Sequence, residues 1–98
     1  MKIMGYDYKL VSEDIVDDTG VYGRFHSKSQ RIQIAEDICI QQKISTVLHE
    51  IIEALNYHNQ WELSHNTLMS LEANLYQALT DNGVDLRPLV KEILSSER

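Results

Sequence analysis

The chain has 98 residues and a mass of 11.3 kDa, which is enough for one domain and too little for two. Hydrophobic residues make up 43% and charged residues 24% of the sequence, a composition typical of globular proteins that excludes a disordered chain. Fifteen acidic against nine basic residues give a net charge of −6, the wrong sign for a protein that binds nucleic acid through its phosphates.

The first part of the chain has the patterns of β-strands, between about residues 6 and 35. Aromatic and aliphatic side chains alternate with polar ones over 6–11, which predicts a first strand. An acidic segment over 12–20 is interpreted as a loop. Residues 21–26 resume the strand pattern, and 30–35 form the return strand after a short polar turn. Two strands joined by such a turn predict a hairpin, and hence a small antiparallel or mixed three-stranded sheet.

The remainder of the chain has the periodicity of α-helices. One helix is predicted from about 40 to 57 and a second from about 64 to 81, and a short third helix from about 86 to 95. Ser64 is the predicted N-cap of the second helix, and Gly83 is its predicted stop in the left-handed conformation. Strands followed by helices predict an α+β domain. The apolar stripes are Ile44, Val47, Leu48, Ile51 and Leu55 in the first helix, and Leu68, Leu71, Leu75 and Leu79 in the second.

The first helix contains the sequence His49-Glu50-Ile51-Ile52-Glu53. Residues four apart share a helix face, so His49 and Glu53 project together, with Glu50 about 100° round from His49. This is the geometry of the H-E-x-x-H site, in which the outer residues bind zinc and the Glu activates water. A carboxylate is a competent zinc ligand, so the pattern predicts zinc ligands at His49 and Glu53 and a catalytic Glu50. The alternative is a solvated helix face.

A zinc site needs a third protein ligand. On the second predicted helix, His65 and Glu72 lie on one face beside the leucine stripe. If the two helices pack antiparallel through their stripes, this face meets His49 and Glu53, and His65 or Glu72 completes the site. One ion cannot easily bind both, because they are separated by about 10 Å of helix rise. For each of them the alternative is an ordinary polar position: beside the helix cap for His65, and exposed for Glu72.

Five segments of the chain carry a resemblance beyond this motif. They are Tyr22–Arg24, Arg31–Ile34, Gln41–Gln42, Thr46–Leu55 and Leu75–Asn82. In this order they resemble the small zincin-like metallopeptidases of phages and prophages, which are related to the ImmA/IrrE group. The resemblance implies a minimal zincin-like fold, in which a small sheet packs on an active-site helix and a second helix brings the third ligand.

The same resemblance implies a zinc-dependent peptidase with a peptide or protein as substrate. Zinc lowers the pKa of a water molecule in such enzymes, and the Glu that corresponds to Glu50 takes its proton. Glu53 stands where the family has its second His, and Met69 stands near its downstream Glu ligand. His65 or Glu72 could substitute, and Glu72 is slightly preferred on chemical grounds. These departures support the alternative of a catalytically lapsed protein that serves as a metal-binding or protein-interaction module.

The sequence also predicts where the protein works. The single Cys39 cannot form an internal disulfide, which favours a reducing compartment. No apolar run exceeds three residues, so neither a membrane span nor a signal-peptide core is expected. We therefore expect a protein of the bacterial host cytoplasm, with a peptide or protein partner and with no nucleic-acid or membrane partner.

Overall fold

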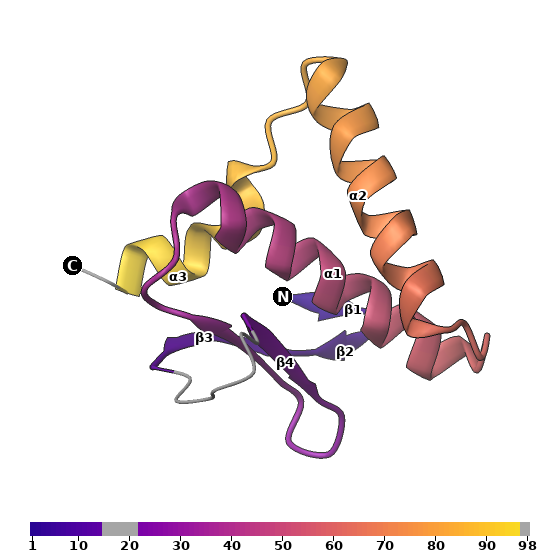
Figure 1. Ribbon diagram of the computed structural model, residues 1–98. Coiled ribbons are helices and arrows are strands. Elements are labelled where there is room, and N and C mark those ends of the chain that lie inside the picture. Colours follow the sequence, from indigo (N-terminus) through magenta and orange to yellow (C-terminus); the bar gives the residue numbers. More distant parts are fainter. Residues whose placement is uncertain (15–21, 97–98) are drawn as a thin grey trace.

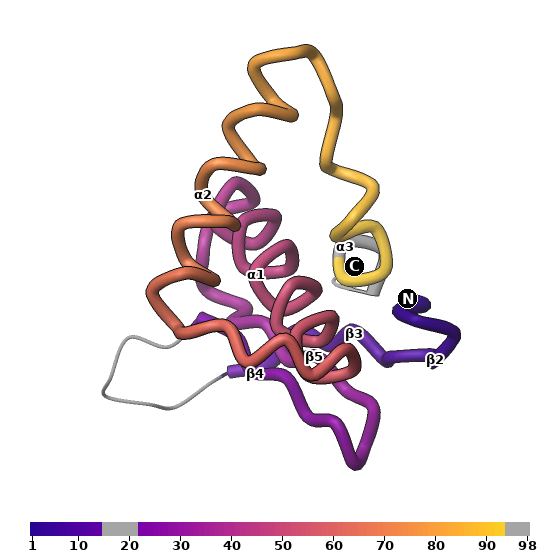
Figure 2. Tube along the Cα trace, turned by 90° about the vertical axis from the view of Figure 1, so that its right-hand side faces the viewer, coloured from indigo at the N-terminus to yellow at the C-terminus, as the bar shows by residue number. Residues whose placement is uncertain are grey.

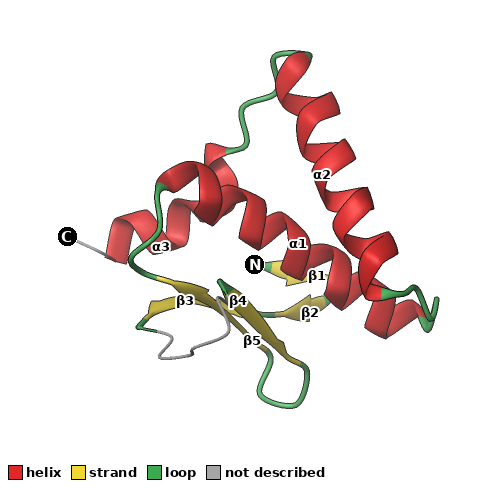
Figure 3. Ribbon diagram, in the orientation of Figure 1, coloured by secondary structure: helices red, strands yellow, loops and turns green. Residues whose placement is uncertain are grey.

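The computed structural model describes residues 1–14 and 22–96, and it is an α+β fold in which small sheets pack against helices (Figures 1 and 3). Most of the loop predicted over 12–20 and the start of the strand predicted over 21–26 lie outside these residues. The strands are β1 (Lys2–Ile3), β2 (Tyr6–Asp7), β3 (Lys9–Glu13), β4 (Gly23–His26) and β5 (Arg31–Ala35), and the helices are α1 (Ile40–Asn59), α2 (His65–Asp81), the 3-10 turn η1 (Arg87–Val90) and α3 (Lys91–Ser96).

The main sheet has three strands in the order β3-β5-β4, with β3 parallel and β4 antiparallel to β5. The hairpin of β4 and β5 and the mixed sheet confirm the prediction. Leu10 of β3 and Phe25 of β4 are both in register with Ile32 of β5, so these three side chains share one face of the sheet. Ile32 is buried between its neighbours and α1, and this row joins the sheet to the helical layer.

The single strand predicted over 6–11 is wrong in one respect, because the chain changes partner at Tyr8. Residues before it pair with β1 in a separate two-stranded sheet, and residues after it pair with β5. The backbone N–H of Tyr8 donates to the carbonyl of Met1. Both Tyr8 and Leu10 are buried, so the alternation of side chains continues through the break and gives no sign of it.

The strand β3 also continues to Glu13, beyond its predicted end at residue 11. The Glu13 carboxylate accepts hydrogen bonds from Arg31 at 2.8 Å and from the Gln33 amide at 2.9 Å, both on β5. His26 of β4 extends this network through the side-chain oxygen of Gln33 at 2.6 Å. Polar side chains on the outer face therefore tie all three strands together.

Helix α1 supplies most of the contact with the sheet. Ile44 and Val47 of its predicted apolar stripe are buried in the main core, which also contains Ile34 of β5. The C-terminal segment closes this core from the other side with Val90 of η1 and Ile93 of α3. Periodicity therefore identified buried positions of α1, most of which pack against the main core, whereas Leu48 of the same stripe faces α2.

The connection between α1 and α2 is held by specific backbone geometry. Gln60 ends α1 in a left-handed conformation with φ of 54°, and its N–H donates to the carbonyl of Tyr57. Glu62 is also left-handed, with φ of 59°. The side-chain oxygen of Asn56 accepts a hydrogen bond of 3.0 Å from the N–H of Leu63. These interactions fix the place where α2 begins.

Helix α2 begins and ends where the sequence predicts. The Ser64 hydroxyl accepts a hydrogen bond of 3.2 Å from the N–H of Thr67, which is the geometry of an N-cap. The helix ends at Asp81, and Gly83 follows with φ of 81°. Glycine suits this position because its lack of a Cβ removes the cost of the left-handed conformation.

The leucine stripe of α2 is only partly used, so α1 and α2 pack through part of their stripes. Leu68 is buried against Leu48 and Ile52 of α1, in a small cluster separate from the main core. Leu71 and Leu75 are instead 42% and 38% exposed. In Figures 1 and 2 the two helices meet near the start of α2, and the far end of α2 stands away from the body.

The predicted third helix over 86–95 begins with a 3-10 turn and continues as α3. The Asp85 carboxylate accepts hydrogen bonds from the backbone and the side chain of Arg87. These bonds lower the pKa of Asp85 to about 2.

Within residues 1–14 and 22–96, no helix combines the length and the apolar character that a membrane span requires.

Candidate metal centre

The predicted site residues come together where α1 and α2 meet. A pocket of about 490 Å³ lies between these helices and the start of β4. The first turns of α2 face the middle of α1, which carries the histidine and glutamate motif. The pocket is lined by Gln42, Ser45, Thr46, His49 and Glu50 of α1, by His65, Met69 and Glu72 of α2, and by Tyr22 and Gly23.

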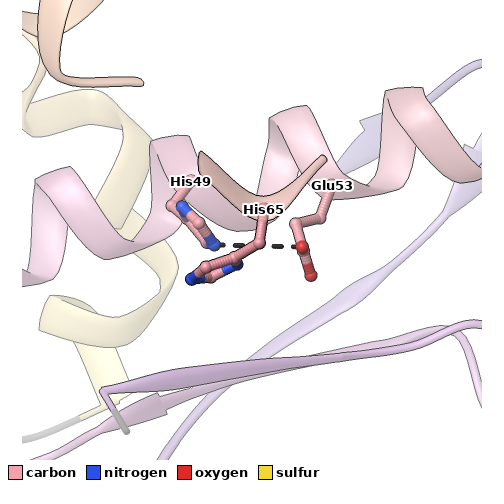
Figure 4. A group of neighbouring side chains, drawn as sticks. All are labelled: His49, Glu53 and His65. Carbon is pink, nitrogen blue, oxygen red and sulfur yellow. Dashed lines mark ion pairs between the residues drawn. The ribbon is translucent and has the colours of Figure 1, made fainter. Parts of the chain in front are cut away.

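Three of the predicted ligands form a group that could hold a metal ion. Nε2 of His49 lies 4.0 Å from Oε1 of Glu53, one turn further along α1. The ring of His65 lies 5.9 Å from the ring of His49, at an angle of 72°. One ligand atom from each residue lies within 4.8 Å of the other two (Figure 4). Imidazole and carboxylate donors in this number suit a divalent transition metal.

Glu50 is buried beside this group. It is 3% exposed, and its Oε2 has no hydrogen-bond partner among the residues that the structure describes. Burial, and to a smaller extent the charge of Glu53, raises the pKa of Glu50 to about 8. A carboxyl at an ordinary core position would have a hydrogen-bond partner or be replaced by an apolar side chain. A buried carboxyl without a partner at the wall of a pocket is therefore a candidate for a functional role.

Glu72 lies on the other side of the His49 ring. Its Oε1 is 3.9 Å from Nδ1 of His49, and its side chain is 16% exposed. The two alternatives for a third ligand, His65 and Glu72, are therefore both next to His49. His65 joins the group with Glu53, and Glu72 faces the second ring nitrogen.

Several pocket residues were not identified as functional from the sequence. Ser45 and Thr46 lie one helical turn before His49 and Glu50, so extending the helical spacing by one turn predicts both of them. Met69 lines the pocket and is 51% exposed, so the position where the resemblance places a ligand carries a thioether instead.

Gly23 sets the distance between β4 and α1 at the edge of the pocket. A Cβ at this position would lie 2.5 Å from Cγ2 of Thr46 and 3.2 Å from the carbonyl oxygen of Gln33. Both distances are shorter than van der Waals contact, and the carbonyl belongs to the sheet itself. Only a residue without a side chain fits, so Gly23 allows the strand to approach the helix that carries the site.

The charge of the site is negative. Glu72 lines the pocket and Glu53 lies beside it, whereas none of the described lining residues is Lys or Arg. Such a pocket attracts cations and repels phosphate groups.

Comparison with family models, curated proteins and solved structures finds no match for this chain. The resemblance seen in the sequence therefore stays a prediction, and the function is inferred from the site.

Proposed function

We propose that this chain is a small zinc-dependent peptidase with a zincin-like fold, in which His49, Glu53 and His65 hold the ion and Glu50 is the general base. The observation that carries the proposal is the position of a buried, unpartnered carboxyl next to a group of three metal-binding side chains. In a motif where the same helix supplies two ligands and a base, these are the groups that hydrolysis requires.

The donor set fits zinc. Two imidazoles and one carboxylate are a known set of three protein ligands in catalytic zinc sites, which leave a fourth position open. Tetrahedral zinc has bonds of about 2.0–2.1 Å, so its ligand atoms lie about 3.3 Å apart. The ligand atoms of His49 and Glu53 are 4.0 Å apart, and those of the whole group lie within 4.8 Å of one another. Small rotations of the side chains would bring these distances to the value for zinc. His65 is exposed and begins its helix, which leaves its ring room to turn.

The protein residues have distinct tasks in this proposal. A zinc ion, when bound, supplies a Lewis acid that acidifies water and polarises a peptide carbonyl. Glu50 accepts the proton from the attacking water and returns it to the leaving amine. In the metal-free protein its pKa of about 8 keeps most of it protonated at neutral pH, and the charge of a bound cation would lower that pKa and favour the carboxylate that a base requires. Tyr22 and Met69 are about half exposed and give the pocket apolar walls for a substrate side chain.

The remaining parts of the proposal concern context. The acidic pocket disfavours nucleic acid and suits a peptide or protein substrate. The ordered local sequences support a phage or prophage origin, and the single Cys39 supports a bacterial cytoplasm. The origin and the compartment rest on the sequence, whereas the metal and the base rest on the geometry of the site.

The first experiment measures metal. Protein purified without an affinity tag is analysed for its metal content and titrated with Zn²⁺. We expect one equivalent in the wild type and loss of binding in His49→Ala, with no change in His26→Ala, because His26 lies on the outer face of the sheet. Less than about a tenth of an equivalent of any transition metal, with no binding on titration, contradicts the proposal.

The second experiment measures catalysis. A mixed peptide library is incubated with the zinc-loaded protein, and new termini are detected by mass spectrometry. We expect cleavage by the wild type and at least a 100-fold loss in Glu50→Gln, consistent with the usual contribution of a general base of about 10²–10⁴-fold. Glu36→Gln is the matched control, because Glu36 is an exposed carboxylate outside the pocket.

A second candidate is a zincin-like protein that binds metal or a protein partner without catalysis. It is favoured by Met69, which occupies the pocket with a side chain unsuited to hold zinc in a peptidase, and by the carboxylate of Glu53. Stoichiometric zinc binding without cleavage of any library member selects this candidate.

A further inference from the structure

Glu72 is the carboxylate that the metal-binding group leaves out. It comes from α2, whereas His49 comes from α1, so their contact spans the meeting point of the two helices. Its side chain is 16% exposed and its Oε1 lies 3.9 Å from Nδ1 of His49. A mostly buried carboxylate in this place needs a partner, because burial without one is costly.

The two nitrogens of the His49 ring face different carboxylates. Nε2 lies 4.0 Å from Glu53, and Nδ1 lies 3.9 Å from Glu72. The lone pair or proton on each nitrogen points outward in the ring plane, so a group at Nε2 and a group at Nδ1 lie on different sides of the ring. An ion bound by His49 through Nε2 would therefore lie on the side of Glu53, whereas Glu72 lies nearer the other nitrogen.

A neutral imidazole carries one proton, and a metal binds the nitrogen that lacks it. A carboxylate at the other nitrogen holds the proton there, fixes the tautomer and orients the ring. We propose, on the basis of the metal site proposed above, that Glu72 is a positioning residue that accepts a hydrogen bond from Nδ1–H of His49 and so presents Nε2 to the ion. The two atoms close by about 1 Å to reach the usual length of such a bond.

The competing assignment makes Glu72 a ligand. An ion near Glu72 would use Nδ1 of His49 and would abandon Glu53, which faces the opposite nitrogen. The group of side chains whose donor atoms gather within 4.8 Å consists of His49, Glu53 and His65 and does not include Glu72. The positioning role uses both carboxylates at once, whereas the ligand role uses only one of them.

The tautomer of His49 tests this role directly, and it can be measured in the metal-free protein. Histidine side-chain ¹⁵N spectra of the metal-free protein are recorded at a pH where the ring is neutral, and His49→Asn identifies the signals of this residue. We expect the Nδ1–H form to be populated in the wild type and to decrease in favour of the Nε2–H form in Glu72→Ala, where Glu53 at Nε2 is the carboxylate that remains. Asp81→Asn is the matched control, because it removes an exposed carboxylate elsewhere on α2 and should change nothing.

Zinc affinity, measured by competition with a chromophoric chelator, gives a second readout. We expect Glu72→Ala to weaken binding by about 10–100-fold at unchanged stoichiometry, as replacement of an outer-shell partner does. Glu72→Gln should be milder, because its amide oxygen still accepts from Nδ1–H. The absorption spectrum of the Co²⁺-substituted protein should be unchanged in Glu72→Ala and altered in Glu53→Ala.

The outcomes separate the two proposals. An unchanged tautomer in Glu72→Ala, or a Co²⁺ spectrum altered as much as in Glu53→Ala, overturns the positioning role. A wild type that shows the tautomer shift on mutation but binds no metal overturns the proposed function and leaves the contact between Glu72 and His49 established.

Discussion

Gly23 packs directly against Thr46, and this contact fixes how closely the edge strand β4 approaches the helix that carries the site. A methyl carbon added at Gly23 would lie 2.5 Å from Cγ2 of Thr46, which leaves no space for any side chain. Thr46 cannot turn away without cost, because its hydroxyl donates a hydrogen bond of 2.7 Å to the carbonyl of Gln42. The close approach of strand and helix therefore depends on the missing side chain of Gly23.

Gly23→Ala tests this contact. The added methyl should destabilise the protein by about 1–3 kcal/mol through overpacking, measured by urea unfolding. Thr46→Ser removes the opposing methyl and keeps the hydroxyl, so it should recover part of that loss in the double variant. A double-mutant cycle in which the two changes are strictly additive would show that the side chains do not meet.

The pKa of Glu50 makes the stability of the metal-free protein depend on pH. The value is about 8 in the folded state and about 4.5 in the unfolded chain, so the folded state holds this proton more tightly. The resulting stabilisation is complete below about pH 4.5 and is lost as the pH rises through about 8, by at most about 5 kcal/mol. Unfolding measured with a chelator present should show this decline in the wild type.

Glu50→Gln cannot ionise, so its stability should lack that part of the pH dependence. It should be more stable than the wild type above pH 8, where the wild type holds a buried charge. Glu36→Gln, which changes an exposed carboxylate, should follow the wild-type profile. A Glu50→Gln protein with the wild-type slope would mean that Glu50 is already ionised in the folded state.

Ser64 caps the helix that begins with the proposed ligand His65. Ser64→Ala removes the acceptor for the N–H of Thr67 and should cost about 1 kcal/mol of stability, with the cost measured by urea unfolding. Ser64→Asp keeps an acceptor at this position and should remain close to the wild type. Equal losses in both variants would show that the hydrogen bond is not the reason for the effect.

Tyr8 and His58 join the N-terminal segment to the end of α1. The Tyr8 side chain is 1% exposed, and its hydroxyl is hydrogen-bonded to Nε2 of His58, whose ring is stacked on Tyr6 with centroids 4.6 Å apart. Tyr8→Phe leaves the nitrogen without its partner and should lower the free energy of unfolding by about 1–2 kcal/mol. Tyr57→Phe should stay within about 0.5 kcal/mol, because Tyr57 is 56% exposed.

The helices could be predicted from the sequence because their signals are local. The spacing of Ile44 and Val47 marks the buried face of α1, and Ser64 and Gly83 mark the limits of α2. The strand break at Tyr8 could not be predicted, because alternation reports which side chains are buried and not which strand lies alongside. The exposure of Leu71 could not be predicted for the same reason, since an apolar stripe does not reveal whether another element covers it.

The candidate site was predicted as a set of residues more fully than as an arrangement. The helical spacing of His49 and Glu53 placed both on one face, and the face of α2 with His65 and Glu72 was expected to meet them. Which nitrogen of His49 faces Glu72 depends on how α2 is placed against α1, which no local pattern contains. The structure supplies that placement, with Glu72 and His65 both next to the His49 ring.

The division of the buried apolar side chains into two clusters has a thermodynamic consequence. The main core joins the sheet to α1 and α3, whereas α2 is fastened mainly through the smaller cluster of Leu48, Ile52 and Leu68, with Tyr76 packed against both clusters. An ion shared by α1 and the first residue of α2 would close only a short length of chain, so it would remove little entropy from the unfolded state. Its ligand bonds would instead act on a local equilibrium, the docking of α2, while the rest of the domain folds on its own core.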